Sequence, residues 1–169
     1  MQLTTARARV LVALTKLAVS GAVLASGFRA VGDDDYARVE IAQRFAEAPR
    51  LDPSGTSWLP LPFWLTGAAM RAFGARLEVA QVLAGVLGVL AMIAVFEAGR
   101  WLWRDDRSAL AGAILACVMP WSARLGVATV PELPTAALAV LATASLAPGG
   151  PPTRRALGAV ALMAACLSR

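Results

Sequence analysis

The chain has 169 residues, of which 58% are hydrophobic and 16% charged, and its mean hydropathy is +0.63. Soluble domains carry about 45–50% apolar and about 25% charged residues, so this composition excludes disorder and an ordinary soluble domain and predicts that lipid covers part of the surface. The 16 basic residues outnumber the 11 acidic ones but are scattered, which excludes a nucleic-acid-binding surface and fits the cytoplasmic loops of a membrane protein.

The first predicted element is an apolar run over residues 10–28, preceded by Arg7 and Arg9. Its length matches the roughly 20 residues of a membrane-spanning helix. The small residues at 25–27 also fit a signal-peptide cleavage site, but a signal core is usually about 7–15 residues long. This run is longer and contains Lys16, so we favour an uncleaved signal anchor. Lys16 either snorkels to the cytoplasmic boundary or faces the helix bundle.

Residues 29–76 carry acids and arginines in near balance, which indicates a large extracytoplasmic loop. Apolar side chains recur at about one helical turn over residues 33–48, which predicts a helix that begins with three aspartates and stops at Pro49. Residues 52–60 are rich in turn formers. Residues 61–73 then predict an interfacial helix that leads to the second span.

Three further spans and the start of a fifth follow. We expect spans over residues 79–96, 109–123 and 133–147, and the beginning of another over 156–169. Ser108 is a suitable N-cap for the third span, which weakens at Pro120 and Arg124. The fourth run is short, and hydropathy alone also allows a re-entrant pair here.

The sequence therefore predicts an all-α integral membrane protein: a multi-spanning helical bundle with four to five transmembrane helices and short helices in an extracytoplasmic loop. With the N-terminus in the cytoplasm, the arginine clusters at 7–9, 100–107 and 154–155 all lie inside, and the five tryptophans lie at membrane interfaces. We treat residues 1–169 as a single membrane domain. Because only about 12 apolar residues follow Arg155, where about 20 are needed, we expect an incomplete fifth span and a longer protein.

The residue types available for catalysis are few. The chain has no histidine, which excludes Ser-His-Asp and Cys-His catalysis and imidazole metal sites. Its two cysteines, Cys117 and Cys166, lie in apolar runs and are typical of small buried hydrophobic residues. Acid–base chemistry must therefore depend on carboxylates, on Lys16, on Tyr36 or on groups assisted by arginine.

The most distinctive segment is VGDDDYARVEIAQRF, residues 31–45, in which Asp33, Asp34 and Asp35 follow the first span. Acids at a helix start act as caps and favour the helix dipole, but one residue is enough for that role. Three carboxylates at the membrane surface also fit a general base or a cation site.

Two further segments are predicted on the same side of the membrane. Glu132, in VPELP, is either a solvated acid in a tight turn or part of a site with Arg124, which can pair with Glu132 or with a phosphate. The segment SWLPLPFWLTG, residues 57–67, either anchors the chain at the interface or walls a groove for a lipid-linked substrate.

The order of these segments resembles the membrane glycosyltransferases of the GT-C fold, in particular the bacterial protein-mannosyltransferase and aminoarabinose-transferase group. The resemblance covers residues of about 10–147. It is carried by the acidic cluster with its following aromatic and alanine, by a proline-rich stretch ending in Trp-Leu, and by a glutamate–proline element that opens the fourth span. These are Asp33-Asp34-Asp35-Tyr36 with Ala42, Leu59-Pro60-Leu61-Pro62-Phe63-Trp64-Leu65, and Pro131-Glu132-Leu133-Pro134.

The resemblance implies an inverting enzyme of the bacterial inner membrane that moves a sugar from a polyprenyl-phosphate donor to a protein or glycolipid acceptor on the extracytoplasmic face. It implies that Asp33 or Asp34, with Asp35 as the third choice, is the general base. The substrate-binding candidates are Tyr36, Arg38, Trp58, Trp64, Arg124 and Glu132. Carboxylates and phosphate suit Mg²⁺ or Mn²⁺, but the resemblance does not require a metal.

Two other classes fit the same hydropathy. A small transporter or channel subunit would use Lys16 and Arg124 as intramembrane charges, although the acids lie outside the predicted spans. A structural assembly factor would use the large extracytoplasmic loop.

Overall fold

The computed structural model describes residues 4–168, which form α-helices and short connections without a β-strand. The eight helices are α1 (Thr5–Ala25), α2 (Asp33–Glu47), α3 (Leu61–Phe73), α4 (Leu77–Trp103), α5 (Asp106–Val118), α6 (Pro120–Leu125), α7 (Glu132–Ser145) and α8 (Pro152–Cys166).

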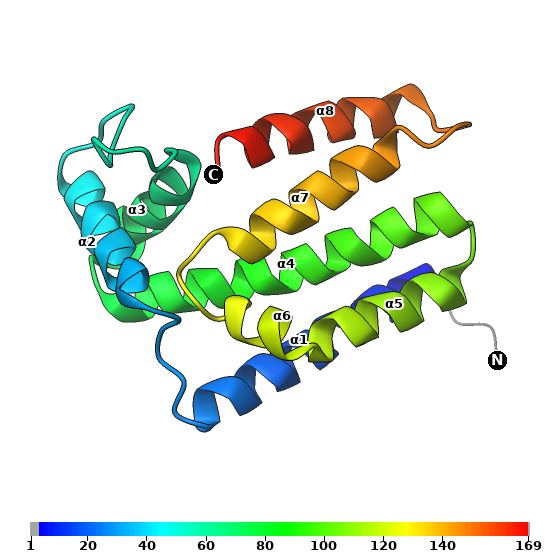
Figure 1. Cartoon of the computed structure of the whole chain (residues 1–169), viewed down its shortest axis with the longest axis horizontal. Coiled ribbons are helices and arrows are strands. Elements are labelled where there is room, and N and C mark those ends of the chain that lie inside the picture. The colour runs from blue at the N-terminus through cyan, green and yellow to red at the C-terminus, as the bar shows by residue number, and fades with distance from the viewer. Residues whose placement is uncertain (1–3, 169) are drawn as a thin grey trace.

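The long helix α4 lies at the centre of the bundle (Figure 1). Helix α7 packs along one side of α4 and α8 packs outside α7, while α5 and α1 pack on the other side. Helices α2 and α3 pack on each other at the end of the bundle where α4 begins. We call this the α2–α3 end. The chain also returns to it at the end of α8, where Leu61 N–H donates to the Leu167 carbonyl (3.1 Å).

The opposite end of the bundle collects charged residues from α1, α4 and α5, and we call it the arginine end. Arg9 pairs with Glu97 (2.7 Å), and Glu97 also pairs with Arg100 (2.9 Å). Arg100 reaches Asp106 (2.7 Å), which accepts a further hydrogen bond from Thr5 (3.1 Å). Arginines that are distant in sequence therefore lie together, as the charge pattern predicts.

The all-helical fold is confirmed, but length and composition identify two candidate membrane spans in the part of the chain that the structure describes. These are α1, with 21 residues, and α4, with 27. Helices α5, α7 and α8 have 13, 14 and 15 residues, which at 1.5 Å per residue gives about 20–23 Å, below the roughly 30 Å of a hydrocarbon core. The predicted third span, residues 109–123, is interrupted at Pro120. Because proline has no N–H to donate, α5 ends before it and α6 begins at it.

Local signals place the remaining helix ends. The predicted helices over 33–48 and 61–73 are present as α2 and α3, and α2 ends just before Pro49. The predicted N-cap of the third span is wrong. Asp105, not Ser108, caps α5, because its carboxylate accepts hydrogen bonds from the N–H groups of Arg107 (3.2 Å) and Ser108 (2.9 Å).

Small side chains let the bundle helices approach closely. The main cluster of buried residues joins α1, α4, α5, α6 and α7. Five of its eleven members are alanine, and Met92 and Phe96 are among the larger ones. In contrast, leucines and valines on the outer faces of the bundle are exposed, including Leu14 of α1, Val82 of α4 and Leu115 of α5. Such an apolar outer surface is typical of helices in contact with lipid.

Candidate functional site

Asp35 is the buried member of the acidic cluster, with 3% of its surface exposed. Its Oδ2 accepts hydrogen bonds from the N–H groups of Val31 (2.8 Å) and Gly32 (3.3 Å). Its Oδ1 accepts hydrogen bonds from the N–H (2.7 Å) and the hydroxyl (2.9 Å) of Thr129. Both oxygens of this carboxylate are therefore engaged by donors.

These bonds join two distant parts of the chain. Gly32 is the N-cap of α2, so Asp35 closes the helix start as an acid at the third helical position commonly does. Thr129 lies 94 positions away, in the connection between α6 and α7. A carboxylate whose two oxygens each accept two hydrogen bonds has no lone pair left for a substrate. Asp35 therefore acts as a structural clamp.

Asp33 and Asp34 differ from Asp35 in their solvent exposure and in their hydrogen bonding. Both are exposed in the first turn of α2, and within residues 4–168 neither makes a hydrogen bond or an ion pair. Tyr36 is 51% exposed beside them. The two free carboxylates sit at a helix N-terminus, where the helix dipole favours negative charge, and they are exposed to solvent.

The Asp35–Thr129 clamp brings Glu132 to the same end of the bundle. Glu132 begins α7, three residues after Thr129, and its Oε2 is buried without a hydrogen-bond partner among the described residues. Arg124, in the last turn of α6, is exposed. Arg124 was expected to pair with Glu132 or with a phosphate. Within residues 4–168, Arg124 and Glu132 form no ion pair, so the first of these pairings is absent.

Arg38 and the tryptophans hold the turn-rich segment against α2 and α3. The Arg38 guanidinium carbon lies 4.4 Å from the centre of the Trp58 ring and 5.9 Å from that of Phe63. The Trp64 indole N–H donates to the Leu51 carbonyl (3.2 Å). The contacts of Trp58 and Trp64 therefore hold residues 51–58 against α2 and α3. Arg38, which contacts Trp58, belongs to the same helix as the aspartates, α2.

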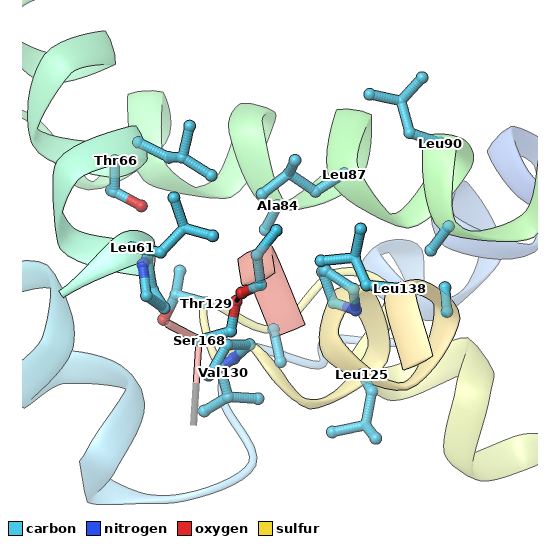
Figure 2. A pocket seen from close by; sticks show the side chains of 18 of the residues that line it. Leu61, Thr66, Ala84, Leu87, Leu90, Leu125, Thr129, Val130, Leu138 and Ser168 are labelled. Carbon is cyan, nitrogen blue, oxygen red and sulfur yellow. Dashed lines mark hydrogen bonds between the residues drawn. The ribbon is translucent and has the colours of Figure 1, made fainter. Parts of the chain in front are cut away.

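The structure also contains an apolar cavity of about 440 Å³, and the segment 57–67, which the sequence offered as a groove wall, contributes Leu61, Pro62, Leu65 and Thr66 to its lining. Figure 2 shows side chains from α3, α4 and α7 around it, and residues near the end of α8 complete the wall. The cavity lies at the α2–α3 end. Thr129, which clamps Asp35, also lines it, so the cavity and the acidic cluster are adjacent. The lining includes Leu61, Thr66, Ala84, Leu87, Leu90, Leu125, Val130, Leu138 and Ser168.

The arrangement of the aspartates bears on metal binding. In the part of the chain that the structure describes, no group of three or more acidic or cysteine side chains could hold a metal ion. Asp35 is turned inward to Thr129, whereas Asp33 and Asp34 are exposed, so the three adjacent carboxylates do not converge. A cation at this site would rely on Asp33, Asp34 and the phosphate of a substrate.

No protein-family model, curated protein or solved structure matches this chain.

Proposed function

We propose that this chain forms the donor-binding and base-carrying part of a membrane glycosyltransferase that uses a polyprenyl-phosphate sugar. The observation that supports this most strongly is the juxtaposition of an apolar cavity with two free carboxylates at one end of an apolar helical bundle. A lipid-linked sugar needs both features, because its chain requires an apolar surface and its acceptor requires a base.

The proposed orientation places the arginine end in the cytoplasm and the α2–α3 end outside. Arg9, Arg100 and Arg154 come from three segments and lie at the arginine end, as expected for cytoplasmic loops. Arg9 and Arg100 both pair with Glu97, and the Arg154 guanidinium carbon lies 5.6 Å from the centre of the Trp101 ring in the last turn of α4. In this orientation α1, α4, the α5–α6 pair, α7 and α8 alternate in direction across the membrane (Figure 1). We propose that they form the five spans, with local thinning of the bilayer around the short helices α7 and α8.

The cavity suits the isoprenoid chain of the donor. Its volume of about 440 Å³ falls in the usual range of ligand pockets, about 300–1,000 Å³, and its wall is almost entirely aliphatic. Thr129 and Thr66 provide the polar groups in the part nearest α2. A donor lying there would place its phosphate and sugar next to the start of α2.

The chemistry follows from the exposed acids. Asp33 or Asp34 takes the proton of the acceptor hydroxyl, and the oxygen attacks the anomeric carbon of the sugar. The bond from that carbon to the phosphate oxygen breaks on the opposite side, so the configuration inverts. Arg38 is the nearest cation on the same helix and would stabilise the departing phosphate, with Arg124 as a second candidate.

A transporter or channel would require charges along a water-filled path. Lys16, the strongest candidate for such a charge, is fully buried and donates to the Ser122 carbonyl (2.9 Å). This contact makes Lys16 part of the packed bundle, which favours the enzyme over the transporter.

Binding of a labelled polyprenyl-phosphate hexose to the full gene product in nanodiscs tests the proposal. We expect saturable binding that unlabelled polyprenyl phosphate displaces. Ala84→Trp fills the cavity and should abolish binding, whereas Val82→Trp, on the exposed face of the same helix, should leave binding unchanged. Absence of binding to the unmodified protein, or equal binding by both variants, would contradict the proposed donor site.

A further inference from the structure

Lys16 is the largest fully buried side chain in the described part of the protein, with 0% of its surface exposed. It lies in the middle of α1 and donates a hydrogen bond from Nζ to the carbonyl of Ser122 (2.9 Å). Burial of an ammonium group among apolar helices is costly, so the contact it makes requires an explanation.

The carbonyl that Lys16 binds belongs to the last turn of α6. Ser122 also accepts a hydrogen bond from the Gly126 N–H (3.0 Å), which closes this turn. The carbonyl end of a helix carries partial negative charge, and lysine side chains are favourable partners for the last carbonyls. Lys16 thus caps α6 from a different helix.

Gly126 is required here by space and not by backbone geometry. Its φ of −79° and ψ of 0° suit any residue, but a Cβ at this position would overlap Nζ and Cε of Lys16. On the other side, a Cβ on Gly88 of α4 would lie 2.5 Å from the Gly126 carbonyl oxygen. The chain at Gly126 is therefore fixed between α1 and α4.

Only two residues separate this fixed point from Thr129. The intervening Val127 and Ala128 are buried, so the segment has little room to shift. Thr129 then holds Asp35 and lines the apolar cavity, and Glu132 follows at the start of α7.

We infer that Lys16 is a positioning residue: through Ser122 and Gly126 it fixes the segment 126–131, and through Thr129 it sets where the acidic start of α2 lies relative to the cavity. The catalytic consequence rests on the proposed function, whereas the structural coupling does not. Lys16 never touches a substrate, so its effect must be transmitted through the Thr129–Asp35 clamp.

Hydrogen exchange on the full gene product in nanodiscs tests the coupling directly. We expect Lys16→Met to raise the exchange rate of amides in 126–131 and 31–35 about tenfold or more, since Thr129 N–H and Val31 N–H depend on the clamp. Leu17→Met, an exposed neighbour on α1, is the matched control and should change neither segment.

A second variant approaches the same contact from the other side. Gly126→Ala should produce the same increase in exchange, because the added Cβ displaces the end of the Lys16 side chain from the Ser122 carbonyl. It serves as the primary test if Lys16→Met does not accumulate. Unchanged exchange in 31–35 for the folded variants overturns the inference.

Activity separates positioning from general loss of structure. We expect Lys16→Met to lower kcat for sugar transfer about tenfold or more while leaving the donor KM within about twofold, because the cavity remains but the carboxylates move. A raised KM with unchanged kcat would contradict the positioning role. If the unmodified protein shows no transfer but the exchange results hold, the proposed function fails and the coupling stands.

Discussion

Replacing Asp35 by asparagine keeps the shape of the side chain and exchanges one acceptor oxygen for an NH₂ donor. Whichever way the amide is turned, the new donor faces two donors: either the N–H groups of Val31 and Gly32, or the N–H and hydroxyl of Thr129. When the NH₂ faces Thr129, the Thr129 hydroxyl can accept from it and still donate to the backbone carbonyl of residue 35 (3.0 Å), so the Thr129 N–H loses its acceptor. In the other orientation the N–H groups of Val31 and Gly32 lose theirs. We therefore expect Asp35→Asn to destabilise the protein strongly.

The magnitude follows from the Thr129 N–H in the less costly orientation. A donor left without a partner costs about 1–3 kcal/mol, so the loss is on the order of 1–3 kcal/mol. For a chain of this size about 1 kcal/mol corresponds to roughly 2–4 °C, which predicts a fall in melting temperature of about 2–12 °C. Asp34→Asn, at an exposed position in the same turn, removes only a helix-dipole interaction of about 0.3–1 kcal/mol.

Thermal unfolding in detergent, followed by tryptophan fluorescence, measures the difference. Thr129→Val removes only the hydroxyl donor and should fall between Asp34→Asn and Asp35→Asn. Equal melting temperatures for the two aspartate variants would refute the assignment of Asp35 as the structural clamp.

Three further outcomes are expected. Gly67→Ala places a Cβ 2.9 Å from a backbone oxygen of α2, so it should loosen α2 from α3 and lower the melting temperature by an amount equivalent to about 1–3 kcal/mol. The hydrogen bond from Arg100 lowers the pKa of Asp106 in the folded protein. Because the folded-state pKa is depressed, the stability that ionised Asp106 contributes is present above the unfolded pKa and is lost as the pH falls below about 4. Asp106→Asn should therefore flatten the acid limb of a circular-dichroism titration. In a cysteine-free background, an impermeant thiol reagent applied from outside should label Ser54→Cys but not Ser108→Cys; the opposite pattern contradicts the proposed orientation.

Local sequence signals predicted much of the secondary structure. Aspartates at a helix start and the proline after it define α2, and the prolines and aromatics of residues 57–67 lead into α3. The break at Pro120 was also visible, because proline lacks the N–H that a continuous helix needs. The N-cap of α5 was missed because the helix begins at Asp106, three residues before the expected start at 109, so Asp105 stands at the cap position and accepts from the N–H groups of Arg107 and Ser108.

The candidate site depends on contacts that no local pattern encodes. The different environments of Asp33, Asp34 and Asp35 arise from Thr129, which is far away in sequence. The cavity is assembled from residues of five helices, α3, α4, α6, α7 and α8, and of the 128–131 connection, so no single segment shows it. The sequence left two positions open for Lys16, at the membrane boundary or inside the bundle. Its partner is the backbone carbonyl of Ser122, and a backbone group cannot be recognised from residue types.

Sugar transfer by single Asp→Asn variants at 33 and 34 tests the central claim most directly. The assay measures transfer from a polyprenyl-phosphate sugar by membranes that contain equal amounts of the full gene product. Asparagine keeps the shape and leaves the Asp35 clamp intact but cannot accept the proton, so the variant at the base should lose about 10²–10⁴-fold in rate with little change in melting temperature. Near-normal rates for both variants would contradict the account and leave the acidic cluster as a helix cap.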